Sequence, residues 1–197
     1  MTSKIRTSQR VERVRKVLGQ RQKDLTLVIN NIHDPHNVSA ILRSCDAFGV
    51  AAVHLLYTRN TFPVLGKKSS ASAKKWVERV NHPCVPSLVE SLSSQGMNLI
   101  RTGFSKTAIA VHEWDFTRPT AVVLGNEHSG VEKDLQKVVD QEIYIPMLGM
   151  VQSLNVSVAA AIILYEAYRQ RNRVGFNSGS YFSQEELEDL FQKWIEK

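Results

Sequence analysis

Short apolar runs of strand length alternate along the chain with segments of helical periodicity. The apolar runs occupy residues 25–29, 51–57, 97–101, 120–124 and 143–145. The segments with helically spaced apolar residues occupy residues 9–18, 38–48, 86–95, 131–139 and 156–171. Strands that alternate with helices are typical of βαβ units. The pattern therefore predicts an α/β fold built on a mainly parallel sheet.

Two terminal segments lie outside this alternation. The first helical segment is basic, with Arg10 and Arg13 on the faces away from its apolar residues. Residues 183–196 begin with a capping box, Ser183 with Glu186, and carry an apolar stripe that must be buried on the body or on another subunit. We expect three parts: a basic helix within residues 1–22, a central domain at 23–172, and a linker with an amphipathic helix at 173–197.

The stretch from residue 143 to residue 164 joins a strand, a glycine-bearing loop and an apolar helix. Ser153, Asn155 and Ser157 cluster where this helix begins, and such residues satisfy the unpaired backbone N–H groups of a helix start. The helix is apolar on nearly every face, which predicts burial. A small-molecule site fits this arrangement. An ordinary strand-to-helix turn with a good cap fits it as well.

Composition narrows the class of protein. A chain of 197 residues with 43% hydrophobic residues suits one globular domain. The formal charge of +6 and the pI near 9.4 favour a polyanionic partner. Cys45 and Cys84 match neither a disulfide framework nor a zinc motif, which indicates a reducing compartment. With no signal peptide or membrane-length apolar run, we expect a cytoplasmic protein.

Several familiar motifs are incomplete. Gly125 and Gly130 have the glycine spacing of a phosphate loop, but Val131 and Glu132 stand where lysine and a hydroxyl residue are required. No dinucleotide fingerprint follows a strand. His33 and His36 lack a third metal ligand at a recognisable spacing. Ser153 is not in a nucleophile elbow. A nucleotide hydrolase, a dehydrogenase, a metal enzyme and a serine hydrolase are therefore disfavoured.

Polar clusters follow three of the predicted strands. Asn37 is the predicted N-cap of the helix at 38–48, and Arg43 lies within that helix. The other clusters are Asn126 with Glu127, and Ser153 with Asn155. Ligands of open α/β sheets bind at the carboxyl ends of the strands. The residues alone thus predict a ligand site at this edge of the sheet, beside basic surface.

Three segments then show a family resemblance. Residues 36–43, 124–130 and 145–157 resemble the three motifs of the SpoU/TrmH branch of the SPOUT methyltransferases. The resemblance runs from the basic helix to about Arg173. Residues 115–120, with Phe116 where the family usually has tyrosine, resemble most the members that methylate the 2′-oxygen of guanosine 18 in the tRNA D-loop.

The resemblance implies a six-stranded parallel sheet with a deep C-terminal trefoil knot, flanked by terminal helices, and makes residues 23–172 the catalytic domain. Topology rules alone would not suggest a knot. It also implies that S-adenosylmethionine, the methyl donor, binds bent in the knot. The implied donor contacts are Thr102, Gly103, Leu124, Gly125, Asn126, Ile145, Met147 and Leu154.

The family gives the main catalytic role to the arginine matching Arg43, helped by Asn37. A guanidinium stays protonated in proteins, so it is a poor base. Our hypothesis is that Arg43 binds the neighbouring phosphate and the 2′-oxygen, and stabilises the developing alkoxide. Glu127, Ser153 and Asn155 then orient the ribose and the loop.

The resemblance also implies partners. The chain is expected to bind tRNA as a homodimer, without a metal, a membrane or DNA. The residues expected to contact phosphate are Arg10, Arg13, His36, Lys67, Lys68, Arg169 and Arg171. The two lysines belong to a long loop or weak helix at residues 59–75.

Two alternatives stay open from the sequence. One is 2′-O-methylation of another RNA, either ribosomal RNA or the tRNA wobble position. Ribosomal relatives often carry an extra N-terminal domain and wobble-position relatives usually lack both terminal helices, which favours the D-loop. The other is a non-catalytic RNA-binding protein, which the intact set of polar site residues disfavours.

Overall fold

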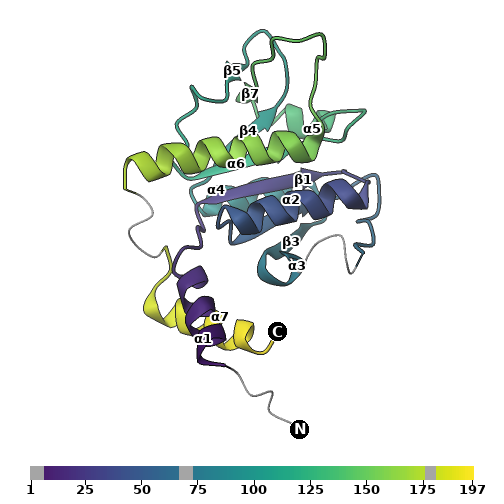
Figure 1. Ribbon diagram of the computed structural model, residues 1–197. Coiled ribbons are helices and arrows are strands. Elements are labelled where there is room, and N and C mark those ends of the chain that lie inside the picture. Colours follow the sequence, from purple (N-terminus) through teal and green to yellow (C-terminus); the bar gives the residue numbers. More distant parts are fainter. Residues whose placement is uncertain (1–6, 67–72, 176–180) are drawn as a thin grey trace.

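A parallel seven-stranded sheet forms the centre of the molecule in the computed structural model, which describes residues 7–66, 73–175 and 181–197 (Figure 1). The strand order is β3-β2-β1-β6-β4-β7-β5 and every pairing is parallel. The α/β prediction is therefore confirmed, with seven strands in place of six. The strands are β1 Leu25–Asn30, β2 Ala52–Leu56, β3 Glu78–His82, β4 Asn98–Thr102, β5 Ile109–Ala110, β6 Thr120–Leu124 and β7 Glu142–Tyr144.

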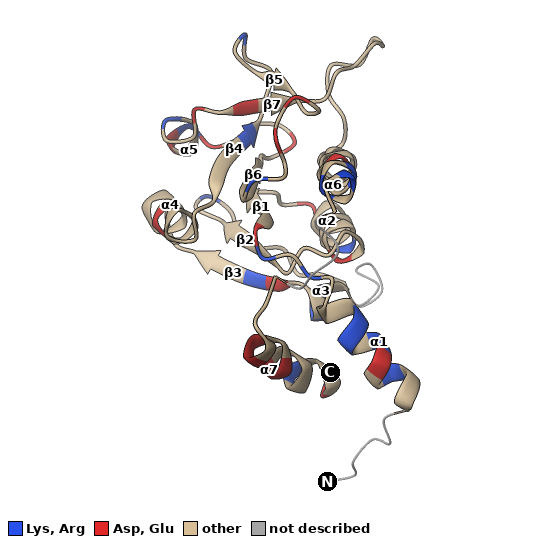
Figure 2. Ribbon diagram, turned by 90° about the vertical axis from the view of Figure 1, so that its left-hand side faces the viewer, with Lys and Arg blue, Asp and Glu red and all other residues tan. Residues whose placement is uncertain are grey.

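Helices cover both faces of this sheet. Helices α2 and α6 pack on one face, and α4 and α5 pack on the other, which Figure 2 shows with the sheet between them. The helices are α1 Ser8–Leu18, α2 Pro35–Ala47, α3 Ala73–Trp76, α4 Val85–Ser94, α5 Lys133–Gln136, α6 Val156–Arg173 and α7 Gln184–Ile195. Within the described ranges, no helix combines the length and the hydropathy that a bilayer span requires.

The first strand is buried on both faces, as a central strand of a parallel sheet must be. Leu27 and Ile29 point into the core beneath α2 and α6, while Val28 points into the core beneath α4. Strand β1 pairs with β2 on one side and with β6 on the other. This pairing aligns the carboxyl ends of β1 and β6, where the polar clusters of the sequence begin.

The start of α2 differs from the prediction. Asp34 is the N-cap, its carboxylate accepts a hydrogen bond from the backbone N–H of His36 at 2.8 Å, and Pro35 occupies the first helical position. Proline is favoured there because its missing N–H would be unpaired in any case. Asn37 therefore lies inside the first turn, and its side chain is free to leave the helix end and bond elsewhere.

Helix α6 is less buried than its composition predicts. Its inner face, with Ala160, Ile163 and Leu164, is fully buried, but Val158, Tyr165 and Tyr168 are exposed on the other side. The prediction of a helix buried all round is wrong for the single chain. An exposed apolar face of this kind is typical of a contact surface rather than of a core.

The two terminal helices pack on each other beside the sheet. Val14 and Leu18 of α1 form an apolar cluster with Phe191, Trp194 and Ile195 of α7, separate from the two main cores. The capping box predicted at the start of α7 is present. The apolar stripe of the tail is thus buried on α1, within the same chain.

Arg171 connects segments that are distant in the sequence through side-chain hydrogen bonds. It was expected to contact phosphate, but its side chain is completely buried, so that prediction is wrong. Its guanidinium donates to Asp24 at 2.6 Å, to Gln22 at 2.8 Å and to the Phe116 carbonyl at 2.8 Å. The family-typical tyrosine position, occupied here by Phe116, is likewise fully buried next to it.

Replacing Arg171 tests this structural role. Arg171→Met leaves Asp24 and a backbone carbonyl without their donor, and we expect a loss of about 3 kcal/mol in the free energy of unfolding, measured with urea. Arg173→Met, an exposed position at the end of the same helix, is the matched control and should change stability by less than about 0.5 kcal/mol. Equal stability of the two variants would contradict the assignment.

Candidate functional site

The site lies at the carboxyl edge of the sheet, where the connections after neighbouring strands separate. The chain leaves β1 towards α2 on one face and leaves β6 towards α5 on the other. Connections that diverge in this way open a crevice, and ligands of open α/β sheets bind in such crevices. The loops after β4 and β7 reach the same edge.

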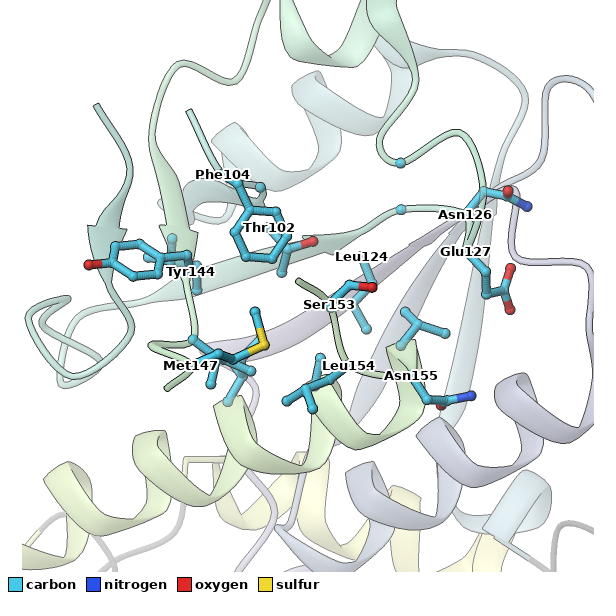
Figure 3. A pocket seen from close by; sticks show the side chains of 18 residues that line it. Thr102, Phe104, Leu124, Asn126, Glu127, Tyr144, Met147, Ser153, Leu154 and Asn155 are labelled. Atoms are coloured by element: carbon cyan, nitrogen blue, oxygen red, sulfur yellow. The ribbon is translucent and has the colours of Figure 1, made fainter. Parts of the chain in front are cut away.

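A cavity of about 430 Å³ occupies this edge, within the usual range of ligand pockets. All eight residues expected to contact the methyl donor line it, and Glu127, Ser153 and Asn155 line it too. Figure 3 shows Tyr144, Phe104 and Met147 toward one end and Asn126, Glu127 and Asn155 toward the other. The pocket is therefore mostly apolar, with its polar groups gathered at one end.

Part of the pocket lining was not predicted from the sequence. Val156, Ala159 and Ile163 of α6 form the wall beside Leu154, and their spacing puts them on one helical face. That periodicity was available as a signal. Gly130, Ile143 and Tyr144 also line the pocket and lie in segments that the sequence singled out, whereas Phe104 gave no signal.

Two glycines allow backbone segments to approach each other at this pocket. A Cβ on Gly125 would lie 2.3 Å from the carbonyl carbon of Gly130 and 2.3 Å from the nitrogen of Val131. A Cβ on Gly103 would lie 2.1 Å from Oε1 of Glu142. Glu142 is buried, pairs with Arg101 and accepts a hydrogen bond from the N–H of Ser105 at 2.7 Å. Both glycines are required by close packing rather than by a positive φ.

A chain of hydrogen bonds joins three separate segments at the polar end. Asn37 donates to Oε1 of Glu127 at 2.6 Å, and Asn155 donates to Oδ1 of Asn37 at 3.0 Å. Asn155, one of three polar residues predicted to lie at the start of this helix, is also the N-cap of α6 and accepts from the N–H of Ser157 at 2.8 Å. The structure thus connects three of the residues expected to be catalytic, from α2, from the loop after β6 and from the start of α6.

Further polar contacts hold the loop after β1 against the loop after β6. Asn126 donates to the carbonyl of Asn31 at 2.9 Å, and His33 Nδ1 lies 3.8 Å from the carboxylate of Glu127. Tyr57 donates to the carbonyl of Ile32 at 2.6 Å. Burial and the nearby Glu127 carboxylate raise the pKa of Tyr57, so this phenol stays protonated and keeps donating. These contacts fix the relative position of both loops.

The remaining expected residues lie apart from the pocket lining. Arg43 is exposed on α2, and none of the described residues makes a hydrogen bond or ion pair with it. Arg10, Arg13, His36 and Arg169 are also exposed, and Arg169 is paired with Glu166 at 2.8 Å. Lys67 and Lys68 lie outside the described residues. Among the residues that are described, no cluster of three or more histidine, cysteine or acidic side chains is arranged to hold a metal.

The fold and this pocket define an α/β protein of the parallel-sheet type with a small-molecule site at the carboxyl edge. The profile of the SpoU rRNA Methylase family matches residues 24–165. The chain belongs to the SpoU methylase family, as the three sequence motifs predicted.

Relatives of known structure or activity resemble the chain over most of its length. The tRNA (guanosine(18)-2′-O)-methyltransferase of Thermus thermophilus is 42% identical over 192 residues, which cover 98% of each chain. The crystal structure of the Aquifex aeolicus TrmH/SpoU tRNA modifying enzyme matches with a TM-score of 0.89, 38% identity and 95% coverage of each chain. The SpoU methyltransferase AviRb from Streptomyces viridochromogenes, solved in complex with AdoMet, matches with a TM-score of 0.67 and 28% identity over 77% of this chain and 62% of AviRb.

Gly125→Ala tests the close approach that shapes the pocket. Because the new methyl group meets backbone atoms of two residues, we expect a loss of about 2 kcal/mol in the free energy of unfolding. We also expect a weakening of S-adenosylmethionine binding of about tenfold or more, measured by calorimetry. Gly149→Ala is the control, because a Cβ there meets nothing within 4 Å. Unchanged stability and donor binding in Gly125→Ala would refute this account of the pocket.

Proposed function

We propose that the protein transfers a methyl group from S-adenosylmethionine to the 2′-oxygen of guanosine 18 in the D-loop of tRNA. One observation carries the proposal: the eight expected donor contacts line a single pocket, whose polar end joins Asn37, Glu127 and Asn155. Full-length similarity to a tRNA (guanosine(18)-2′-O)-methyltransferase supports the choice of substrate.

The residues of the pocket suit this donor. Leu124, Leu154 and Ile145 offer apolar walls for a planar base, and the close backbone around Gly125 offers N–H and C=O groups. When bound, S-adenosylmethionine supplies an electrophilic methyl group on a sulfonium sulfur. The acceptor ribose then belongs at the polar end of the pocket, because Glu127, Ser153 and Asn155 line the pocket with side chains able to hydrogen bond it.

The hydrogen-bond chain at the polar end gives the ribose a fixed environment. Glu127 accepts a hydrogen bond from the side-chain amide of Asn37 through Oε1, which holds its carboxylate in one orientation. Its second oxygen can then accept from a ribose hydroxyl. A fixed acceptor lowers the entropic cost of aligning the 2′-oxygen with the methyl group. We assign Arg43 to the neighbouring phosphate and to the developing charge on that oxygen, which an always-charged guanidinium stabilises.

We also propose that the active form is a homodimer. Leu148 and Met150 of the loop between β7 and α6 are almost fully exposed, and Tyr165 and Tyr168 are exposed on α6. Large apolar side chains exposed in this number are typical of protein contacts. A second copy of this chain is the occupant that the family resemblance implies.

Electrostatics favour tRNA as the macromolecular partner. With Arg171 removed, the exposed side chains that we assign to phosphate contacts are Arg10, Arg13, His36 and Arg169. Contacts from Lys67 and Lys68 stay a prediction from the sequence. Such contacts provide salt-dependent affinity without choosing a base. Both cysteines are free, which fits the cytoplasm as the place of action. The trefoil knot stays a prediction of the family resemblance.

The primary test is transfer of labelled methyl from S-adenosylmethionine to an unmodified tRNA transcript. We expect label on the transcript, and no label when guanosine 18 is replaced by its 2′-deoxy form. Label that survives the deoxy substitution would place the reaction at another atom. Donor binding without transfer to tRNA would overturn the proposed substrate and direct the same assay to ribosomal RNA.

The role of Arg43 is tested by Arg43→Lys. Lysine keeps the charge but loses the planar pair of donors, so we expect the single-turnover rate to fall by about tenfold or more, with donor affinity unchanged. Arg79→Lys, at an exposed position of β3, is the matched control and should react at the original rate. A near-normal rate in Arg43→Lys would rule out bidentate contact with phosphate and oxygen.

A further inference from the structure

A second cavity lies beside the donor pocket, in the crevice between the ends of β1 and β6. It measures about 350 Å³, and every residue that lines it, apart from Gly130, has a polar side chain. Asn126 and Gly130 line both cavities, so the two are neighbours that share a wall. The other lining residues include Asn30, Asn31, His33, Arg59 and Glu132.

Glu132 is the charged group of this cavity, and its side chain is only 9% exposed. Its Oε2 atom accepts hydrogen bonds from Thr58 at 2.6 Å, from Asn31 at 3.1 Å and from Asn30 at 3.4 Å. Its Oε1 atom lies 3.7 Å from Nε of Arg59, too far for a hydrogen bond, and no other described residue donates to it. The carboxylate is therefore locked through one oxygen, and the other keeps its capacity to accept.

Asn31 holds this arrangement in place at a conformational cost. Its φ of 53° is the only positive φ of a non-glycine residue in the described part of the chain. Its Oδ1 accepts from the N–H groups of Thr58 and Arg59, both at 3.1 Å, while its Nδ2 donates to Glu132. A left-handed conformation of this kind persists where the surroundings enforce it, and such residues cluster at ligand sites.

This cavity lies where the base of the acceptor nucleotide must be when its 2′-oxygen faces the donor pocket. The base of a nucleotide is attached to the carbon next to the one that carries the 2′-oxygen, so a base pocket must border the place of methyl transfer. The 350 Å³ cavity borders the donor pocket through its two shared residues. Two larger cavities beside the terminal helices share no lining residue with the donor pocket.

We propose that the crevice between β1 and β6 binds the base of the acceptor nucleotide and selects guanine through Glu132 and Arg59. This inference rests on the proposed function. Guanine presents two donors, N1–H and the 2-amino group, on one edge, and two acceptors, O6 and N7, on the next. Oε1 of Glu132 accepts from the donor edge, and the guanidinium of Arg59, which is 58% exposed and adjacent, donates to O6 and N7.

The same pair rejects adenine. Adenine places an unprotonated N1 opposite the carboxylate and an amino group opposite the guanidinium donor that bonds O6 of guanine. These two contacts become repulsive, and only the contact to N7 is kept. Because Glu132 is already held by three side-chain donors, it cannot turn away without breaking those bonds. A site built to bond particular groups discriminates strongly against ligands that lack them.

The experiment pairs two substitutions with two altered bases. Single-turnover methylation is measured on tRNA carrying guanosine, inosine or 7-deazaguanosine at position 18, where inosine lacks the 2-amino group and 7-deazaguanosine lacks N7. The variants are Glu132→Gln and Arg59→Ala. Asp134→Asn, an exposed carboxylate of α5 paired with Lys137, is the matched control. Binding of S-adenosylmethionine to each variant reports on folding and on the donor pocket.

For the original protein and for Asp134→Asn we expect each altered base to lower the single-turnover rate about tenfold. Glu132→Gln should react about tenfold more slowly with guanosine, lose its sensitivity to the 2-amino group, and keep its sensitivity to N7. Arg59→Ala should show the reverse pattern, with donor affinity unchanged in both variants.

Two results would overturn the inference. One is an original protein indifferent to the loss of the 2-amino group. The other is a Glu132→Gln variant that is slowed equally on guanosine and inosine while keeping the original ratio between them, which is the signature of a structural role. Donor binding with no methylation of any of these tRNAs by the original protein is a different outcome, because it overturns the proposed function itself.

Discussion

The parallel pairing of β1 with β6 is the constraint on which the site depends. It brings the loop after residue 30 and the loop after residue 124 to the same edge, although they are far apart in the sequence. The chain then leaves these two strands towards opposite faces of the sheet, which opens the crevice between them. The donor pocket and the neighbouring polar cavity both lie in that crevice and share part of their lining.

Amide side chains hold this opening in shape. Asn37 and Asn155 each donate and accept, so each connects two segments with one side chain. Asn31 and Asn126 do the same for the loops after β1 and β6. The carboxylates of Glu127 and Glu132 are both fixed by amide donors, and each retains an oxygen for a ligand. Rigid loops and accessible acceptors thus come from the same hydrogen bonds.

Local sequence patterns predicted the elements whose apolar residues are contiguous or regularly spaced. Strand β6 occupies residues 120–124, as the apolar run indicated, and the family resemblance identified the fold and much of the pocket lining. Strand β3 was missed because its residues, Glu-Arg-Val-Asn-His, form an edge strand with little apolar character.

The burial of Arg171 depends on Asp24 and Phe116, which are distant in sequence, so a basic residue near a helix end was misread as surface. The N-cap of α2 was misplaced because Asn37 and Asp34 are both good capping residues, and Pro35 decides between them.

The sheet topology also sets the order in which the molecule can become functional during synthesis. Strand β1 can pair with β2 early, but its other edge has to wait for β6, and the pocket has to wait further for β7 and α6. Until then the unpaired edge of a mostly apolar strand is available to other chains. The pairings join strands that are distant in sequence. The entropy cost of closing the loops between these strands therefore arises before the strand contacts can stabilise the fold. A nascent chain therefore has no donor site until most of its length has been made, and a truncated product lacking α6 has none at all.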